Sequence, residues 1–387
     1  MTPKKNILHV ITKLELGGAQ QNTLYSVKKH NREKYNVFLI AGTEGILVED
    51  AKKIENLKTY FLPELKHELS PYYDLKCLFA LKKIFKEEKI DIVHTHSSKA
   101  GILGRFAAKM ASVPVIIHTV HGFSFNDFQS FLKRSLYVLL ERVAAKVTDK
   151  MIVVTKVDVE KGIKAKVGKT DQYTVIRSGF DLSEFTTPRD LSSIRKEFNI
   201  GKDTKTVGMV ACLKPQKNPA DFVRIAALLK EKHPGTKYFI VGDGEKRAEV
   251  EKLIAENNLK DVIILTGWRK DVAEFIQLFD VVVLTSLWEG LPRVLPQAMC
   301  ARKPVVATAV DGSKEAVVDG VNGYLVAPKD YKAAAEKISA LLFDEKLRKK
   351  LGENGYSMVG EWDQNRMVSD IEKLYVEVQG TKYEVQS

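Results

Sequence analysis

Residues 281–293 read Val-Val-Val-Leu-Thr-Ser-Leu-Trp-Glu-Gly-Leu-Pro-Arg, and this stretch indicates the fold class. A short β-branched run is followed by a polar loop and then by Pro292, which suits the first turn of a helix. The same order of strand, loop and helix recurs along the chain and predicts doubly wound parallel sheets. The predicted strands cover residues 6–11, 37–40, 91–94, 115–119, 151–154, 206–210, 238–241, 262–265, 281–285 and 304–307.

The chain is long enough for two such domains. Its 387 residues exceed the usual size of one domain, and the pattern of strands and helices restarts near residue 206. Residues 180–203 have the composition of an exposed connection. We therefore expect an α/β protein with one doubly wound, Rossmann-like domain over residues 1–185 and a second over 186–363. A final helical segment over 364–387 has no strand after it and is expected to cross back to the first domain.

Positive charge is concentrated in the first half of the chain. Residues 1–185 hold 30 Lys and Arg against 20 Asp and Glu, a net charge of +10, whereas residues 186–387 hold 31 against 29, a net charge of +2. This imbalance indicates an anionic partner for the first domain, such as a bilayer surface, a lipid phosphate or nucleic acid. No nucleic-acid-binding motif accompanies the charge, so nucleic acid is the least favoured of the three.

Cysteine usage and hydropathy bear on the compartment. The three cysteines lie far apart and form no CxxC pair, which favours a reducing, cytoplasmic compartment and argues against a zinc cluster. No apolar run approaches the roughly 18 residues of a membrane span, so any contact with a bilayer is expected to be peripheral.

A pair of glycines follows the first predicted strand. Gly17 and Gly18, at the start of a helix, expose backbone N–H groups that suit a phosphate or diphosphate, although the same residues also suit a plain tight turn. The chain contains neither the GxGxxG nor the GxxxxGK[ST] pattern. NAD and P-loop nucleotides are therefore disfavoured as ligands.

Four of the eight histidines fall where two neighbouring predicted strands end. His94 and His96 are two residues apart on one strand, which places both rings on one face and allows a metal site. Against a metal, no Asp or Glu lies between Asp91 and Asp127 to complete a ligand set. The other interpretations are that His121, which opens the loop after the second strand, hydrogen-bonds a bound ligand or merely caps that loop.

Two loops of the second half carry charge where ligands of parallel sheets bind. Lys217 follows the first strand of that half and is placed to clamp a phosphate, unless it is simply solvated. Glu289 offers a carboxylate to sugar hydroxyls or to positive charge on a sugar ring. The free N–H groups of the helix expected at Pro292 suit a diphosphate.

The order of these motifs over the whole chain resembles that of the retaining nucleotide-sugar glycosyltransferases of family 4, and within them the branch that builds capsule, O-antigen and other exopolysaccharides. The resemblance implies the GT-B fold, in which two Rossmann-like domains face each other across a cleft. The first would bind the acceptor, and the second the donor, a UDP- or GDP-sugar. The segments that carry the resemblance are 17–20 (GGAQ), 94–101 (HTHSSKAG), 121–123 (HGF), 216–218 (QKN), 241–244 (VGDG), 266–268 (TGW), 289–292 (EGLP) and 319–326 (DGVNGYLV).

The resemblance also implies roles for individual residues. It makes His121 a ligand of the donor sugar, Lys217 the clamp on the diphosphate and Glu289 the carboxylate that faces the sugar, and these three are the expected catalytic residues. The other expected donor-binding residues are Gly17, Gly18, Gly267, Trp268, Arg269, Gly290, Leu291, Pro292 and Gln297. The residues expected on the acceptor side are His96, Ser97, Lys99, Phe123 and Phe125.

Two positions depart from the family pattern. Gln297 stands where the family has its second glutamate, so it can hydrogen-bond ribose hydroxyls but carries no charge. Cys212 stands where an arginine usually precedes the lysine, which removes one cation from the leaving diphosphate. Arg177 and Arg293 are the candidates to compensate.

These residues suggest a reaction that needs no metal or other cofactor. The departing nucleoside diphosphate gathers negative charge, and Lys217 and the amides of Gly17 and Gly18 are expected to stabilise it while the phosphate takes the acceptor proton. The chain has no Asp-x-Asp motif of the kind that chelates a metal in the other main transferase fold. Two alternatives stay open: a sugar-nucleotide epimerase or hydrolase of the same fold, and a non-catalytic scaffold in which Cys212 and Gln297 mark lost activity.

A segment of the first domain combines aromatic and basic residues. It is consistent with peripheral binding to an anionic leaflet that carries an undecaprenyl-linked or other saccharide acceptor. The alternative is that the aromatic rings pack in the core and the charges form a solvated helix face. The residues concerned are Phe123, Phe125, Phe128, Phe131, Lys133, Arg134, Arg142, Lys146 and Lys150.

Overall fold

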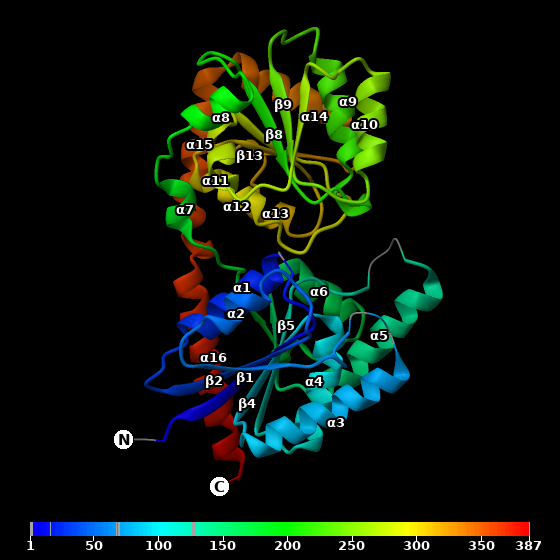
Figure 1. Cartoon of the computed structure of the whole chain (residues 1–387), viewed down its shortest axis with the longest axis vertical. Helices are drawn as coiled ribbons and strands as arrows, with labels where there is room; N and C mark the ends of the chain where they lie inside the picture. Colours follow the sequence, from blue (N-terminus) through cyan, green and yellow to red (C-terminus); the bar gives the residue numbers. More distant parts are fainter. Residues whose placement is uncertain (1–2, 16, 67, 69, 126–128, 387) are drawn as a thin grey trace. The chain divides into compact units, whose positions relative to one another are not determined.

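The computed structural model describes residues 3–386 apart from 16, 67, 69 and 126–128, and over 382–386 it describes the backbone alone. The chain forms two compact units, of which the first comprises Met1–Phe180 and Gln364–Ser387 and the second Asp181–Asp363. Each unit contains a parallel sheet with helices packed on it (Figure 1). The predicted α/β class with two Rossmann-like sheets is therefore confirmed.

The sheet of the first unit has seven parallel strands in the order β3-β2-β1-β4-β5-β6-β7. The central strand β1 is almost continuously apolar because both faces of the sheet are covered, and it pairs with β2 on one side and β4 on the other. The strands are β1 (Lys5–Ile11), β2 (Tyr35–Ala41), β3 (Leu57–Phe61), β4 (Ile92–His96), β5 (Val115–Val120), β6 (Lys150–Val153) and β7 (Tyr173–Val175).

Helices cover both faces of this sheet. On one face, α1 and α16 pack against strand residues such as Ile7, with Ile371 of α16 fully in the core. On the other face, α3 and α4 pack against Leu8 through residues such as Leu81 and Ala107. The helices are α1 (Gly18–Lys29), α2 (Val48–Lys52), α3 (Pro71–Glu87), α4 (Ser98–Met110), α5 (Phe131–Ala145), α6 (Lys156–Lys164) and α16 (Gln364–Gln386), with a 3-10 turn η1 (Thr170–Gln172).

The final helix belongs to the first unit, although it follows the second unit in the sequence. The backbone N–H of Gln364 donates to the carbonyl of Phe180, which joins the start of α16 to the end of the preceding part of that unit. Figure 1 shows α16, in red, running beside α1. No helix among the described residues is both long enough and apolar enough to cross a membrane.

The sheet of the second unit has six parallel strands in the order β10-β9-β8-β11-β12-β13. Its strands are β8 (Thr206–Val210), β9 (Lys237–Val241), β10 (Ile263–Gly267), β11 (Val281–Leu284), β12 (Val305–Thr308) and β13 (Gly323–Val326). Its helices are α7 (Leu182–Thr186), α8 (Ser192–Glu197), η2 (Pro215–Lys217), α9 (Pro219–Leu229), α10 (Arg247–Glu256), α11 (Val272–Leu278), α12 (Val294–Cys300), α13 (Ser313–Ala316), α14 (Tyr331–Phe343), α15 (Glu345–Ser357) and η3 (Val359–Trp362).

Three strands were not predicted from the sequence, namely β3, β7 and β13, and each lies at the edge of its sheet. An edge strand is covered on fewer sides, so its residues are half-exposed and form no continuous apolar run. Apolar runs therefore identified the central strands and the edge strand β10, and missed the other three edge strands.

Each sheet has one point at which the direction of strand addition reverses. In the first unit this point lies between β1 and β4, and in the second unit it lies between β8 and β11. Ligands of open α/β sheets bind at the carboxyl ends of the strands that flank such a point. The loops after β1, β4 and β5 in the first unit, and after β8 and β11 in the second, are therefore the places to look for chemistry.

Candidate functional site

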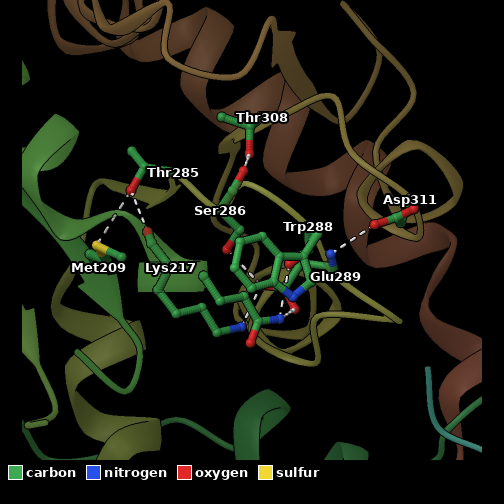
Figure 2. A network of polar contacts seen from close by, with 9 residues as sticks. Met209, Lys217, Thr285, Ser286, Trp288, Glu289, Thr308 and Asp311 are labelled. Carbon is green, nitrogen blue, oxygen red and sulfur yellow. Dashed lines mark hydrogen bonds and ion pairs between the residues drawn. The ribbon is translucent and has the colours of Figure 1, made fainter. Parts of the chain in front are cut away.

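The loops after β8 and β11 bring two of the expected catalytic residues together. Lys217 ends the 3-10 turn η2, which Asn218 closes in the left-handed conformation with a φ of 45°. Glu289 lies in the loop between β11 and α12. The ammonium of Lys217 forms an ion pair with Oε1 of Glu289, and Figure 2 shows the two side chains pointing toward each other.

The carboxylate of Glu289 is buried, with 7% of the residue exposed, and is held at both oxygens. The hydroxyl of Ser286 donates to Oε1 over 2.5 Å, and the amide of Gln216 donates to Oε2 over 3.4 Å. The backbone N–H of Glu289 donates to Asp311 Oδ2 over 2.9 Å. The carboxylate is thus fixed in direction, and Lys217 is the cation that balances it.

Further hydrogen bonds tie the two loops into one rigid platform. The hydroxyl of Thr285 donates to the carbonyls of Lys217 and Asn218 over 2.9 and 3.0 Å. The hydroxyl of Thr308, on β12, donates to the carbonyl of Ser286 over 2.5 Å (Figure 2). The backbone, not only the side chains, therefore sets the distance between the lysine and the glutamate.

Sequence reasoning missed the polar residues that support this pair. Ser286 and Gln216 lie beside the expected residues in the chain, so their nearness was a usable signal. Asp311 lies 22 residues beyond Glu289 in the loop after β12, and only the order of the strands brings it to this site.

The residues expected at a helix start precede the helix. The sequence predicts a helix with Pro292 in its first turn, but α12 begins at Val294, so Gly290 and Leu291 lie in the loop before it. This expectation was wrong by two residues, because Pro292 lies just before the helix, where its carbonyl accepts the backbone N–H of Leu295 over 3.1 Å. Gln297 lies in the first turn of α12 and is half-buried.

The three residues expected near the base lie at the end of β10: Gly267 is its last residue, and Trp268 and Arg269 follow it. Gly267 has a φ of +70°, which a glycine adopts readily, and Trp268 is 63% exposed. The guanidinium of Arg269 is held by two carboxylates, Glu197 at 2.8 Å and Asp271 at 2.7 Å. The hydrogen bonds that Arg269 donates to Asp271 and Glu197 raise the pKa of its guanidinium, so its charge is already balanced.

Cys212, which stands where the family has an arginine, brings no charge to that position. Burial raises the pKa of the Cys212 thiol, so it is neutral at physiological pH. Arg293 lies in the loop that also holds Glu289. Burial lowers the pKa of Arg293 to about 10, with Glu184 acting in the opposite direction, so the guanidinium stays charged near pH 7. Arg177 belongs to the first unit, where it donates to the carbonyl of Val154 over 3.3 Å.

Histidines line the reversal point of the first unit. His9 on β1 lies opposite His94 on β4 in the strand register, and His96 shares their face of the sheet. Nδ1 of His9 lies 3.0 Å from Nε2 of His96, and Nδ1 of His96 lies 3.2 Å from Nε2 of His121. The expected ligand His121 is therefore in contact with a buried imidazole network.

Burial keeps these rings neutral. It lowers the pKa of His9, His94, His96 and His118 well below the ordinary value, and nearby imidazoles and arginines lower it further. Burial also lowers the pKa of His121 to about 4.

Three of the rings are close enough together to be considered as ligands of a metal ion. Single nitrogens of His9, His94 and His96 lie within 4.8 Å of one another. Both nitrogens of His94 are already hydrogen-bonded, to the hydroxyls of Tyr375 and Thr119 at 2.6 Å each. A metal would have to displace those bonds, so the hydrogen-bonded network is the arrangement that the residues support.

The remaining residues expected in the first unit have diverse contacts. Gly17 precedes α1 in an extended conformation, and Gly18 is its first residue. The hydroxyl of Ser97 lies 2.8 Å from that of Thr12, which links the ends of β4 and β1. Lys99 forms an ion pair with Asp74 at 2.5 Å, so its charge is engaged within the unit.

The aromatic segment divides into buried and exposed residues. The rings of Phe123 and Phe125 stack at 4.7 Å, and Phe125 is only 2% exposed within a small core cluster. The expectation that Phe125 anchors a surface contact was therefore wrong, because its ring is already covered by α5 and β6. Phe128 lies outside the described residues. Phe131, at the start of α5, is 79% exposed.

Comparison with known proteins gives consistent matches over both units. The family described as Glycosyltransferase Family 4 matches residues 16–184, and the family described as Glycosyl transferases group 1 matches residues 191–358. The chain is 32% identical over 386 residues to the UDP-Gal:alpha-D-GlcNAc-diphosphoundecaprenol alpha-1,3-galactosyltransferase of Escherichia coli, which covers 97% of each chain.

Two further proteins extend the likeness. The chain is 29% identical over 361 residues to the N,N'-diacetylbacillosaminyl-diphospho-undecaprenol alpha-1,3-N-acetylgalactosaminyltransferase of Campylobacter jejuni, covering 90% of this chain and 93% of the relative. The crystal structure of Anabaena HepE in complex with UDP-glucose matches with a TM-score of 0.82 at 21% identity, over 96% of this chain and 99% of that one, and shows the likeness in fold.

Proposed function

Because this chain belongs to glycosyltransferase family 4, we propose that it transfers a sugar from a UDP-sugar to a saccharide carried on a polyprenyl diphosphate. The family, the GT-B fold and the hexosyltransferase class expected from the motifs are confirmed. The wider role, polysaccharide biosynthesis, is that of its relatives. The donor and the lipid-linked acceptor are our proposal, supported by the names of the two diphosphoundecaprenol-specific relatives.

The single observation that carries the proposal is the Lys217–Glu289 pair at the reversal point of the second sheet. A cation and a carboxylate on one rigid platform match the two charges of the reaction. The leaving diphosphate is negative and the reacting sugar is positive, and fixed charges placed beforehand stabilise both at little cost in reorganisation. We propose that Lys217 exchanges its partner from Glu289 to the donor diphosphate when the donor binds.

The proposed reaction retains the configuration of the sugar and needs no metal. In our proposal the departing phosphate accepts the proton of the acceptor hydroxyl, so no side-chain base is required. The amides of Gly17 and Gly18 and the imidazole of His121 are proposed as further donor ligands, as the family resemblance implies. Trp268, with its exposed ring, is proposed to stack on the base.

We also propose that the first unit binds an anionic membrane surface through α3 and α5, each of which packs against α4. These helices expose large apolar side chains at helical spacing, beside lysines such as Lys76 and Lys133. An anionic leaflet matches both features, and each well-placed cation contributes about 1 kcal/mol. The exposed side chains are Tyr72 (62%), Leu75 (56%), Phe79 (52%), Phe131 (79%), Leu132 (80%), Leu136 (46%) and Leu139 (56%).

The test of the transferase proposal has two stages. Thermal shifts with UDP, GDP, ADP, CMP and NAD identify the base, and a nucleotide-release assay with the matching sugar donors and a synthetic polyprenyl-diphosphate saccharide measures transfer. We expect stabilisation by UDP and turnover that Lys217→Ala lowers by about 10²-fold or more.

A matched control removes a lysine from a surface ion pair of the same unit. Lys252 pairs with Glu256 on α10 at 3.7 Å and is largely exposed, so Lys252→Ala should leave turnover unchanged. Turnover of Lys217→Ala within threefold of the wild type would contradict the assigned role. UDP binding without turnover on any acceptor would instead support a non-catalytic scaffold.

A further inference from the structure

Four histidines form an unbroken hydrogen-bonded chain from His121 to a glutamate of the last helix. Nε2 of His121 lies 3.2 Å from Nδ1 of His96, and Nε2 of His96 lies 3.0 Å from Nδ1 of His9. Nε2 of His9 lies 3.1 Å from Nε2 of His30, which follows α1. Nδ1 of His30 lies 3.0 Å from Oε1 of Glu372 on α16. Both nitrogens of the three inner rings are thus used within the chain.

Such a chain of neutral rings is directional. A neutral imidazole has one N–H and one lone pair, so each ring donates on one side and accepts on the other. If the last ring donates to Glu372, every ring must donate toward Glu372. If the last ring accepts, every ring must donate toward His121. The group at position 372 therefore selects between two tautomeric patterns that differ at every ring.

Glu372 is placed to accept. Its Oε1 also receives the backbone N–H of Asn31 over 2.8 Å, so two donors converge on one oxygen. Burial alone would raise the pKa of Glu372, but the hydrogen bonds from His30 and Asn31 and the nearby Lys34 bring it below the ordinary value. A carboxylate that accepts two N–H groups has no proton to return to His30.

The other charged groups near the hydrogen-bonded histidines do not reverse the direction in which the rings donate. Burial lowers the pKa of His9 and His30, and the nearby Arg32 lowers both further; for His30 the hydrogen bond to Glu372 acts in the opposite direction, but the pKa still lies below the ordinary value. The guanidinium of Arg32 donates to the carbonyl of Val27 over 2.6 Å. His94 packs beside His9 and His96, but its two nitrogens bond to hydroxyls outside the chain.

We infer that Glu372 fixes the tautomer of His121, with the proton on Nε2 and the lone pair on Nδ1, through His30, His9 and His96. No hydrogen bond to Nδ1 of His121 is present among the described residues. That nitrogen is therefore ready to accept a hydrogen bond, and it can accept one from a hydroxyl but not from an ether oxygen or a carbonyl. Glu372 is a positioning residue, because it acts on His121 without touching it.

The consequence for recognition rests on the proposed function. If His121 is a ligand of the donor sugar, its Nδ1 requires a sugar hydroxyl that donates. A sugar in which that hydroxyl is replaced by fluorine or hydrogen would lose the bond. The last helix would then contribute to donor selectivity through the hydrogen-bonded histidines that join Glu372 to His121.

The first experiment measures the tautomer directly and needs no substrate. The full chain is labelled with ¹⁵N-histidine, and the ring of His121 is assigned by the loss of its signals in His121→Asn. Protonated and unprotonated ring nitrogens have well-separated ¹⁵N shifts, so the spectrum reports which nitrogen carries the proton. In the wild type near pH 7 we expect the proton on Nε2. A proton on Nδ1 of the wild type overturns the inference.

Variants at position 372 test the direction of the chain. Glu372→Gln keeps an acceptor oxygen for His30 and Asn31, so the wild-type tautomer should persist. Glu372→Lys offers a donor instead and should move the proton of His121 to Nδ1. The control Glu377→Lys makes the same charge change at a largely exposed residue of α16, which pairs with Lys150 at 3.5 Å, and should leave the tautomer unchanged. An unchanged tautomer in folded Glu372→Lys overturns the inference.

Transfer kinetics then test the consequence separately. Glu372→Lys should raise the KM for the donor sugar about tenfold while the affinity for UDP, which has no sugar, stays the same. Glu372→Gln should restore the wild-type KM. A shifted tautomer with an unchanged KM would remove His121 Nδ1 from sugar recognition and leave the tautomer result standing. Absence of transferase activity would count against the proposed function alone.

Discussion

Acidification should unfold the first unit while the second unit stays folded. Burial lowers the pKa of His30, with the hydrogen bond to Glu372 acting in the opposite direction. It lowers the pKa of five further histidines of the first unit more strongly: His9, His94, His96, His118 and His121. Each stays neutral in the folded unit but takes up a proton once the chain unfolds. Their stabilisation is therefore complete above an unfolded pKa of about 6.5 and is lost as the pH falls below it toward the folded pKa. For His121 the folded pKa is about 4.

The magnitude follows from the number of rings. Each histidine that stays neutral costs about 1.4 kcal/mol of stability per pH unit below about pH 6.5. Five of them lower the free energy of unfolding by roughly 7 kcal/mol at about pH 5.5, and a typical domain has about 5–15 kcal/mol in total. The second unit contains one histidine, His233, whose pKa burial also lowers; its ring is only partly buried, so its loss is less than one fifth as large.

The placement of the tryptophans allows the units to be followed separately. All three, Trp268, Trp288 and Trp362, belong to the second unit. On titration from about pH 7.5 to 5, far-UV circular dichroism should lose roughly half of its amplitude, whereas tryptophan emission should stay native.

The proton count supplies a second check. In urea unfolding followed by circular dichroism, His118→Gln should weaken the pH dependence of the first unit's stability by about one fifth, because one of the five most strongly shifted histidines is removed. His233→Gln is the matched control and should leave that dependence unchanged. Circular dichroism and emission that change together, or a first unit that stays folded at about pH 5, would refute the reasoning.

Three further predictions concern the proposed function. Glu289→Gln frees Lys217 from a partly exposed ion pair, so UDP should bind about fivefold tighter by calorimetry while turnover falls by about 10²-fold; weaker UDP binding would contradict the exchange of partners. Turnover should be insensitive to EDTA, and a loss that magnesium or manganese restores would show that the charges of this chain do not suffice. The full chain should float with anionic vesicles and not with neutral ones, and Phe131→Ser with Leu132→Ser should abolish flotation. The control Phe343→Ser, which removes a 74% exposed ring from the second unit, should leave flotation intact; binding unaffected by the double change would exclude α5 as the contact.

The sequence by itself determined the class of fold and the places where chemistry occurs. A strand buried on both faces must be apolar along its length, so the central strands were visible as β-branched runs such as residues 281–285. Ligands of parallel sheets bind where strands end, so Lys217, Glu289 and His121 were found by their position after such runs. These inferences succeed because each depends on residues that are close together in the chain.

Only the tertiary structure decided which distant residues meet. Glu372 lies 342 residues from His30, and no local sequence pattern predicts that α16 packs where Glu372 can hydrogen-bond His30. Burial of Phe125 depends on the elements that cover its ring, and the start of α12 at Val294 depends on a loop held by distant partners. Periodicity reports how deeply a segment is buried, whereas the identity of its neighbours depends on strand order and on the packing of a whole unit.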